Sequence, residues 1–190
     1  KLLPQLTQYF PKNINTFVDL FSGGFNVGIN VDSKKTICND INSFIIDLYK
    51  ELYNKPINDV LQHIENRIDE YGLSKENEEA FKKFRVYYNK TKDPIDLYTL
   101  SCYSFNYQFR FNNDKEYNNP FGRNRSQFSD NMRNNLILFT QKLKDMNIEF
   151  SSEQFDKLNL QDLNNNDFVY CDPPYLITTG SYNDGNRGFK

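Results

Sequence analysis

The sequence has no tryptophan, one histidine and only three cysteines in 190 residues. Cys38, Cys102 and Cys171 are odd in number and have no paired spacing, which argues against a disulfide framework and a zinc site and fits a reducing cytoplasm. The single histidine, His63, argues against a Ser-His-Asp triad or a multi-histidine metal centre, and it lies in an apolar helical stripe, as structural histidines do. We therefore expect a cytoplasmic protein that uses no metal ion.

Long hydrophobic stretches are also missing. No apolar run approaches the roughly 20 residues that cross a bilayer, and the first residues do not form a signal peptide, so we expect no contact with a membrane. A length of 190 residues suits one domain, or one domain with a smaller insertion. Because the chain begins at Lys1 without a methionine, we expect it to be a fragment whose true start is missing.

Neither sign of charge is in large excess, since the formal net charge is −2, but the charged residues are unevenly distributed along the chain. Residues 82–133 carry ten Lys and Arg against five Asp and Glu, and the rest of the chain is acidic. A basic middle segment suits contact with phosphates, although solvated helices often carry such an excess too.

The first third of the chain predicts a parallel α/β sheet. A short apolar run at 16–21 indicates a buried strand that enters a Ser-Gly-Gly turn, and 35–39 indicates a second strand. Residues 27–31 suit a short helix, and 42–53 have apolar residues at helical spacing. This order of elements is typical of a parallel sheet with right-handed crossovers.

The middle of the chain interrupts that pattern. We predict a helix at 58–71 ended by Gly72, a second helix capped by Ser74, and a third that starts at Asp93-Pro94. The second helix carries an apolar side made of Ala80, Phe81, Phe84 and Tyr88. Residues 106–127 are rich in Asn, Arg and aromatics, and predict a loop or hairpin outside the core. We expect 58–128 to be an inserted, mainly helical subdomain, with 1–57 and 129–190 forming the main domain.

The α/β pattern then resumes. We predict a helix at 130–146, a strand at 148–150, a short turn of helix at 152–158 and a buried strand at 167–171. That last strand leads directly into Asp172-Pro173-Pro174-Tyr175. In open α/β sheets, ligands bind beyond the carboxyl ends of the strands, so this tetrapeptide is placed for chemistry.

The tetrapeptide has the properties that an amino group on an aromatic ring needs before it can act as a nucleophile. Its two prolines stiffen the loop and remove N–H donors, so the carbonyls can only accept hydrogen bonds. The Asp172 carboxylate and the Pro173 carbonyl can hold the two amino hydrogens, and the carboxylate favours the positive charge that develops as nitrogen attacks a sulfonium methyl. Tyr175 offers a ring face to a base that has left the duplex. An Asp-Pro pair alone would indicate an ordinary turn, but the full motif after a strand predicts catalysis.

A second signal indicates a cofactor. Glycines after the first strand let the backbone approach a ligand, and Asp40, at the end of the second strand, can bind ribose hydroxyls. The glycine pair differs from the alternating glycines of dinucleotide sites, and a sulfonium cofactor has no pyrophosphate to bind.

With these motifs, the chain resembles the Dam-type family of DNA adenine-N6 methyltransferases over essentially its whole length. FVDLFSGG resembles the family's cofactor loop, NDIN its ribose motif, and DFVYCDPPY its catalytic strand and loop. NYQFRFN, followed by YNNPFGR, resembles its DNA-facing segment. The resemblance implies a Rossmann-like methyltransferase sheet with an inserted, mainly helical DNA-recognition subdomain. It also implies S-adenosylmethionine as cofactor and S-adenosylhomocysteine as product.

The resemblance also implies roles for individual residues. Catalysis falls to Asp172, Pro173, Pro174 and Tyr175. Cofactor contacts fall to Asp19, Phe21, Ser22, Gly23, Gly24, Asp40, Ile41, Gln154 and Phe155, although an apolar residue such as Phe155 is equally typical of a core. Candidate DNA contacts are Asn106, Arg110, Asn112, Asn118 and Arg123. Arg and Asn can pair with base edges, but most such contacts in complexes go to phosphate.

The predicted function is methylation of adenine N6 in double-stranded DNA by base flipping and direct transfer, in restriction-modification, with a cognate restriction endonuclease as a further expected partner. The absence of a Pro-Cys motif argues against cytosine C5 methylation. Alternatives are a methyltransferase for RNA adenine or protein glutamine, and an inactive DNA- or cofactor-binding module. Phe25 departs from the family pattern, which often has a second glycine there. The Gly-Lys element before the first helix and the last strands are also missing, so we expect the catalytic domain to be incomplete at both ends.

Overall fold

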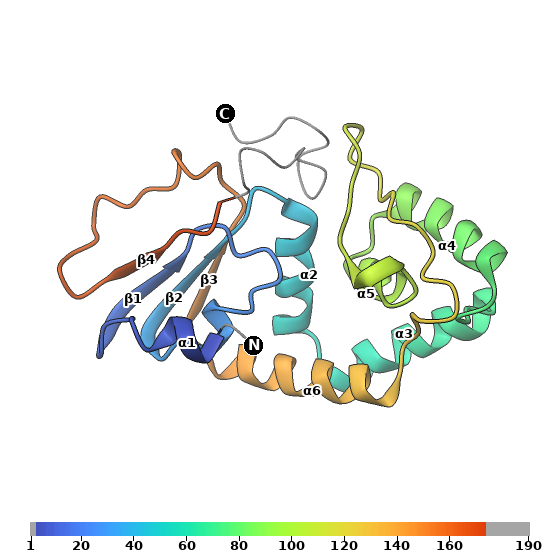
Figure 1. The fold of residues 1–190 in the computed structure, drawn as a ribbon, viewed down its shortest axis with the longest axis horizontal. Coiled ribbons are helices and arrows are strands. Elements are labelled where there is room, and N and C mark those ends of the chain that lie inside the picture. Colours follow the sequence, from blue (N-terminus) through green and yellow to red (C-terminus); the bar gives the residue numbers. More distant parts are fainter. Residues whose placement is uncertain (1–2, 174–190) are drawn as a thin grey trace.

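The computed structural model describes residues 3–173, which form a sheet lobe and a helical lobe (Figure 1). The sheet contains β1 (Ile14–Asp19), β2 (Ser33–Asn39), β3 (Ile148–Ser151) and β4 (Phe168–Tyr170) in the order β3-β2-β1-β4. All three pairings are parallel. The structure thus confirms the predicted α/β sheet.

Both faces of this sheet are covered. Helices α2 (Ser43–Asn54) and α6 (Asp130–Asp145) share a hydrophobic cluster with β2 and β3. The other face buries Val18, Leu20 and Ile37 against leucines from the segment between β3 and β4. A five-residue helix that the sequence did not predict, α1 (Leu3–Thr7), precedes β1, and the 3₁₀ turn η1 (Gly28–Asn30) lies between β1 and β2.

The helical lobe contains the three predicted helices, α3 (Ile57–Tyr71), α4 (Glu78–Thr91) and α5 (Pro94–Cys102). Gly72 ends α3, and the Asp93 side chain accepts hydrogen bonds from the first turn of α5, both as predicted. The predicted cap of α4 was wrong: Asn77, rather than Ser74, accepts from the N–H of Ala80. The Ser74 hydroxyl instead accepts from Glu76 and Asn77 in the preceding turn.

The segment after α5, residues 104–126, is named the arm here. It begins with the 3₁₀ turn η2 (Phe105–Tyr107) and folds back on itself through antiparallel bridges that pair Ser104 with Phe121 and Phe111 with Tyr117. The expectation that this segment lies outside the core was wrong, because the side chains of Phe111 and Tyr117 are only 3% and 1% exposed. Both belong to the hydrophobic cluster that α4 and α5 form.

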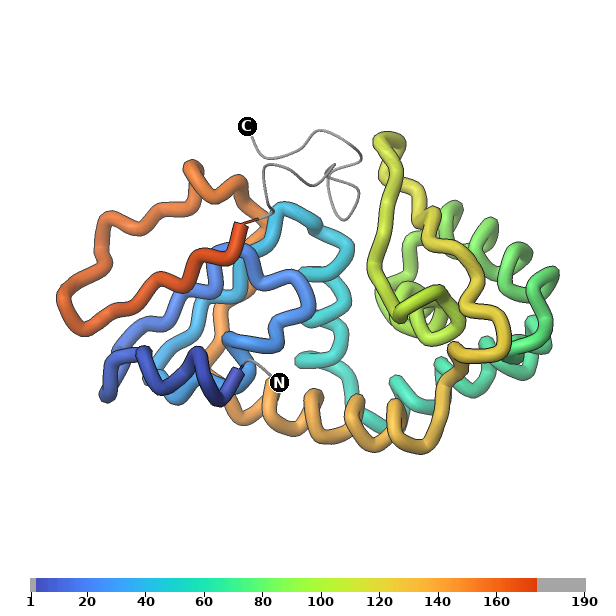
Figure 2. Tube along the Cα trace, in the orientation of Figure 1, coloured from blue at the N-terminus to red at the C-terminus, as the bar shows by residue number. Residues whose placement is uncertain are grey.

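The two lobes share one hydrophobic cluster. Figure 2 shows that α6 runs beneath both lobes. Residues Val60, Leu61 and Ile64 of α3 lie in the same cluster as α2 and α6. Polar contacts add to this within the helical lobe: His63 Nε2 and Arg67 Nε lie 2.7 and 2.9 Å from one oxygen of buried Asp96, which ties α3 to α5. The predicted boundary at residue 58 remains a prediction.

Two further sequence predictions need correction. Strand β4 is half-buried rather than buried, since within the described residues it pairs with β1 on one side only. Residues 152–158 contain a single hydrogen-bonded turn at 154–158 and no assigned helix. Across residues 3–173, no helix combines the length and the apolar character needed to cross a membrane.

Candidate functional site

The carboxyl ends of the four parallel strands meet at one edge of the sheet, named the carboxyl edge here. It comprises the residues that follow each strand: 20–24, 40–42, 152–155 and 171–173. The strand order reverses between β1 and β4, and in open α/β sheets this switch point is where ligands bind. Every predicted cofactor and catalytic residue within the described part of the chain lies at this edge or, as Asp19 does, at the last position of a strand.

Asp19 is the most deeply buried carboxyl group of the carboxyl edge, at 2% exposure. Its Oδ2 accepts a hydrogen bond of 3.0 Å from the N–H of Gly28, which joins the end of β1 to η1. Burial raises the pKa of Asp19 to about 6, and the charges of Asp40 and Asp172 add to the effect while the Gly28 N–H opposes it. Asp19 of β1 therefore interacts electrostatically with the carboxyl groups that follow β2 and β4.

The glycine turn after β1 is fixed by hydrogen bonds to β2 and α2. The N–H of Gly23 donates to Asp40 Oδ2 at 2.8 Å, and the Tyr49 hydroxyl donates to the Gly23 carbonyl at 2.5 Å. Gly23 has a φ of +46°, and a Cβ added there would meet nothing within 4 Å. The turn therefore leaves open space beside a backbone that other side chains hold rigidly.

Asp40 holds two backbone groups at once. Besides Gly23, it accepts a hydrogen bond of 2.8 Å from the N–H of Asn42, the N-cap of α2. Burial raises its pKa, while the two N–H donors oppose the rise. Each carboxylate oxygen can accept more than one hydrogen bond, so this position keeps capacity for a ligand hydroxyl.

Sequence reasoning missed Asn39, which ties three loops together. Its amide donates to the carbonyls of Leu20 and Glu153 at 3.0 and 3.1 Å, and its Oδ1 accepts from the N–H of Glu153 at 3.0 Å. These residues follow β1 and β3, on either side of β2. The signal in the sequence was an amide at the last position of a buried strand, where an apolar residue would be typical.

Apolar side chains are exposed at the same edge. Ile41 is 51% and Phe155 is 42% exposed, and they follow the neighbouring strands β2 and β3. The rings of Phe21 and Phe155 lie with their centroids 5.7 Å apart. Gln154 is exposed next to them, and Ser22 is buried, with its hydroxyl 3.3 Å from the Cys38 sulfur. Exposed apolar surface beside a buried carboxyl group suits a ligand with a flat apolar part and hydroxyls.

Phe25, the departure from the family pattern, fills the space beneath the glycine turn. It is fully buried and its ring lies 5.8 Å from that of Tyr49. Its backbone has a φ of +54°, a left-handed conformation that is rare for a large side chain and costs roughly 1–3 kcal/mol. The ring therefore gains enough packing to hold the loop in a shape that glycine would adopt without strain.

Of the predicted catalytic motif, Asp172 and Pro173 lie within the described residues and Pro174 and Tyr175 lie outside them. Both described residues are exposed. Asp172 follows β4, whose Tyr170 pairs with Asp19 of β1, so it lies near the end of β1, at the switch point. An exposed acceptor beside an acidic, open turn can hold the hydrogens of an amino group close to a bound cation.

The arm is held by polar contacts from its own interior and from α4. The hydroxyl of buried Tyr117 donates at 2.6 Å to Ser104 and lies 2.9 Å from the Gln108 carbonyl. Asn119 donates to the carbonyls of Phe105 and Gln108. Asn89 of α4 brackets the backbone of Tyr117, accepting from its N–H at 2.8 Å and donating to its carbonyl at 3.1 Å.

The five candidate DNA residues all lie in the arm but differ in how free their side chains are. Asn112 folds its own turn, since its Oδ1 accepts from the N–H groups of Asp114 and Glu116. Arg123 is exposed and pairs with Glu78 at the start of α4. Among the described residues, Asn118 Oδ1 is buried and has no hydrogen-bond partner. Arg110 is half-buried, and its carbonyl accepts from the N–H of Asn118, so these two residues are adjacent.

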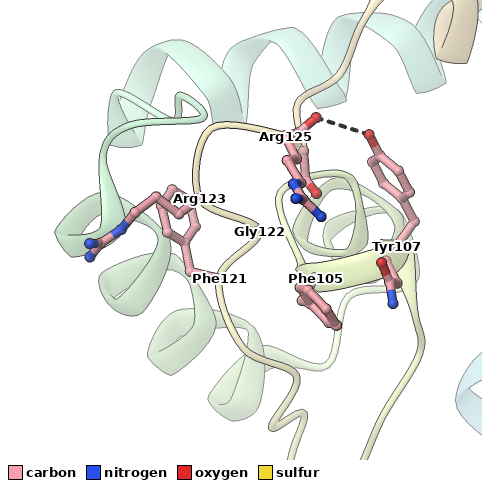
Figure 3. Close-up of a pocket in the computed structure, with 8 residues that line it drawn as sticks. Phe105, Tyr107, Phe121, Gly122, Arg123 and Arg125 are labelled. Carbon is pink, nitrogen blue, oxygen red and sulfur yellow. Dashed lines mark hydrogen bonds between the residues drawn. The ribbon is translucent and has the colours of Figure 1, made fainter.

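Asn106 and Arg123 share a cavity of about 440 Å³ with exposed aromatic residues. Figure 3 shows Phe105 and Tyr107 on one wall, with the Tyr107 hydroxyl donating to the Arg125 carbonyl at 3.2 Å. A Cβ added at Gly122 would lie 2.1 Å from the Ser126 hydroxyl oxygen, so only glycine fits this floor. Aromatic faces with nearby arginines suit nucleotides.

Comparison with known proteins identifies relatives over the whole chain. A family model of D12 class N6 adenine-specific DNA methyltransferases matches residues 1–188. The chain is 62% identical to the Type II methyltransferase M.FokI of Planomicrobium okeanokoites and 58% identical to the modification methylase StsI of Streptococcus sanguinis, covering 100% of this chain in both cases. It is 30% identical to the DNA adenine methylase of Escherichia coli K12, over 96% of this chain and 63% of that protein. The chain spans only 29% of the length of the first two relatives.

Proposed function

The chain belongs to the D12 class of N6 adenine-specific DNA methyltransferases, and from this premise we propose that the protein containing it methylates adenine N6 in double-stranded DNA. The observation that carries the proposal is the carboxyl edge, where an exposed Asp172 adjoins an acidic, glycine-lined turn at the switch point of the sheet. The relatives, one named a Type II methyltransferase and the other a modification methylase, favour a role in restriction-modification, with a cognate endonuclease as partner.

The residues of the carboxyl edge fit S-adenosylmethionine, the methyl donor that this family implies. Its adenine would lie against the exposed Ile41 and Phe155, beside Gln154, and its ribose hydroxyls on Asp40. The open space at Gly23 and the neighbouring Phe21, Ser22 and Gly24 would face the rest of the molecule. Bound there, the cofactor supplies an electrophilic methyl group on a cationic sulfur. The carboxyl groups of Asp19, Asp40 and Asp172 stabilise that positive charge.

The catalytic task of this chain is to hold and activate the adenine amino group. The Asp172 carboxylate and the Pro173 carbonyl accept its two hydrogens, which withdraws the nitrogen lone pair from the ring and aims it at the methyl group. With the cofactor bound, the nitrogen would form its bond to the methyl carbon as the bond from that carbon to sulfur breaks. The extra proton on nitrogen leaves afterwards, with Asp172 as the adjacent acceptor. Tyr175 would stack on the flipped base, which must leave the duplex to reach the edge.

DNA would be held by the arm. Arg110 and Asn118 are adjacent, and an unpartnered Asn118 oxygen is a ready acceptor for a base or for ordered water. Asn106 and Arg123 border the aromatic cavity, and Asn112 supports them by shaping the turn. Phosphate contacts by basic residues of 82–133 would supply most of the affinity. The carboxyl edge and the arm would thus act on the cofactor and on DNA, respectively.

The test uses the complete protein and labelled S-adenosylmethionine with duplex DNA, RNA or a protein extract as separate substrates. We expect N6-methyladenine in DNA, and we expect Asp172→Asn to lower the rate at least about a hundredfold. The same variant should still bind sinefungin, a charged cofactor analogue, by calorimetry. Label found only in RNA or protein, or full activity in Asp172→Asn, would reject the proposal.

A further inference from the structure

Phe44 is an aromatic residue of α2 whose backbone and side chain contact different functional regions. Its backbone N–H donates at 3.1 Å to Asn42, the cap of α2, and the N–H of Asn42 donates in turn to the ribose candidate Asp40. Asp40 also binds the glycine turn through Gly23. Three hydrogen bonds in series therefore link the first turn of α2 to the glycine turn proposed to bind the cofactor.

The side chain of Phe44 reaches the arm. Its ring stacks on that of Phe111, with centroids 4.9 Å apart and an interplanar angle of 18°. Phe111 is buried and pairs with Tyr117, so it belongs to the rigid base of the arm rather than to its exposed turn. In Figure 1, α2 lies between the sheet and the arm, which gives this contact its place in the fold.

Lys92 closes the same contact from the helical lobe. Its ammonium lies 5.2 Å from the centre of the Phe44 ring and donates at 2.7 Å to the carbonyl of Lys115, in the turn of the arm. It also donates to Asn89, which brackets Tyr117. Cation–π and stacking contacts of this kind depend on ring position. A shift of the Phe44 ring would therefore disturb its contacts with Phe111 and Lys92, and Lys92 in turn holds Lys115 in the turn of the arm.

We propose that Phe44 is a positioning residue that couples occupation of the cofactor site to the placement of the DNA-binding arm. This inference rests on the proposed function for the identity of the two ligands. Contact of the cofactor with Asp40 sets the position of the start of α2 through Asn42, and the stacked ring transmits that position to Phe111. Each ligand then binds better in the presence of the other, by a factor that must be the same in both directions.

The first experiment needs no DNA. Hydrogen–deuterium exchange of the complete wild-type protein is compared with and without saturating sinefungin. We expect slower exchange in peptides covering 110–118, which belong to the arm and not to the carboxyl edge. Phe44→Leu should bind sinefungin but lose that protection in the arm. Unchanged exchange in the wild-type arm at saturation would overturn the coupling, even if the protein is an active methyltransferase.

The second experiment measures the coupling itself. The affinity for sinefungin is measured by calorimetry with and without a duplex that carries the methylated site found by mapping cellular DNA. We expect the duplex to tighten sinefungin binding about 5-fold or more in the wild type and less than about 2-fold in Phe44→Leu. Phe44→Tyr, which keeps a stacking ring, should retain the wild-type ratio. Failure to find methyladenine would reject the proposed function and leave the exchange experiment to decide the coupling.

Tyr53→Leu is the matched control. Tyr53 lies on the same helix and its ring packs edge-on against Phe150 of β3, on the sheet side. It should lower stability to a similar degree and leave the coupling ratio unchanged. An equal loss of coupling in Tyr53→Leu, or a wild-type ratio in Phe44→Leu, would show that the stacked pair has no special role.

Discussion

The segments of the carboxyl edge are held largely by side chains from the strand ends themselves, whereas the arm is held by side chains from its own interior and from α4. Asn39 and Asp40 bind backbone groups that lie directly beside them in the sheet. The arm has no sheet to bring its segments together, and it depends instead on the buried contacts of Tyr117 and Asn89. The edge is thus fixed by strand order, and the arm by a few buried polar contacts.

This difference suits the two proposed tasks. A cofactor site must recognise one molecule, so a geometry built into the sheet serves it well. A DNA-reading segment must differ between enzymes with different target sites, and a loop supported at a few buried points can change its exposed residues without loss of support. The following predictions test whether a substitution that disrupts one region leaves ligand binding at the other region intact.

The largest effect should come from removing the central side chain of the arm. Tyr117→Ala deletes a 1% exposed ring and leaves Ser104 and Gln108 without their phenol partner. We expect a loss of about 3–5 kcal/mol in the free energy of unfolding, measured in urea. Tyr117→Phe keeps the ring and should cost about 1–2 kcal/mol. Below its melting temperature, Tyr117→Ala should bind sinefungin almost normally and DNA poorly; equal loss of both would contradict separate support.

The matching change at the carboxyl edge is Asn39→Ala. It removes three hydrogen bonds that a buried amide makes to the loops after β1 and β3. We expect unfolding to become easier by about 2–3 kcal/mol and sinefungin affinity to fall at least about tenfold. Binding to duplex DNA, measured by fluorescence anisotropy without cofactor, should stay within twofold. Intact cofactor affinity in a folded variant would show that Asn39 does not organise the site.

The pH dependence of the edge follows from Asp19. Its pKa of about 6 in the folded protein lies above the ordinary value, so the folded state holds the proton more tightly than the unfolded chain. Stability from this group is present below about pH 4 and is lost as pH rises through 6, by about 3 kcal/mol. Cofactor binding should change in the opposite direction, because carboxylates attract the sulfonium only when charged. Asp19→Asn should flatten both curves, in urea titrations and in calorimetry between pH 5 and 8; unchanged curves would disprove the assignment.

The smallest effect should come from the surface of the arm. Arg123 pairs with Glu78 at an exposed position, and such pairs contribute little to stability because solvent screens them. If Arg123 leaves Glu78 to contact a phosphate, Arg123→Ala should weaken DNA binding modestly and reduce the salt dependence of log K by about one. Glu78→Gln should strengthen DNA binding slightly, since it frees the arginine. An altered methylation site in either variant would instead indicate base recognition.

The sequence predicted the sheet and the helices because these depend on local patterns. A short apolar run marked β1, helical spacing marked α2 and α6, and the order of elements implied where the strand ends meet. The family resemblance was confirmed by the match over residues 1–188. The proposed contacts of individual residues with cofactor and DNA remain predictions.

What the sequence could not reveal depends on contacts between distant segments. The composition of 106–127 indicated a solvated loop, but Phe111 and Tyr117 are buried because α4 and α5 cover them. Both Ser74 and Asn77 are good caps, and only the path of the turn decides that Asn77 meets the free N–H. Asn39 resembles any polar residue at a strand end until the sheet brings Leu20 and Glu153 to it. Strand β4 has an apolar core sequence, yet its exposure depends on which neighbours it has.

The order of elements along the chain has a consequence for biosynthesis. Strands β3 and β4 come after α3, α4, α5, the arm and α6, although β4 must lie beside β1. A ribosome therefore releases the whole helical lobe while, of the four strands in residues 3–173, β1 and β2 alone exist, with their apolar residues still uncovered. Such nascent edges invite pairing with other chains. Rapid folding of the helical lobe, whose contacts are mostly local, shortens the time for which β1 and β2 lack β3 and so limits such pairing.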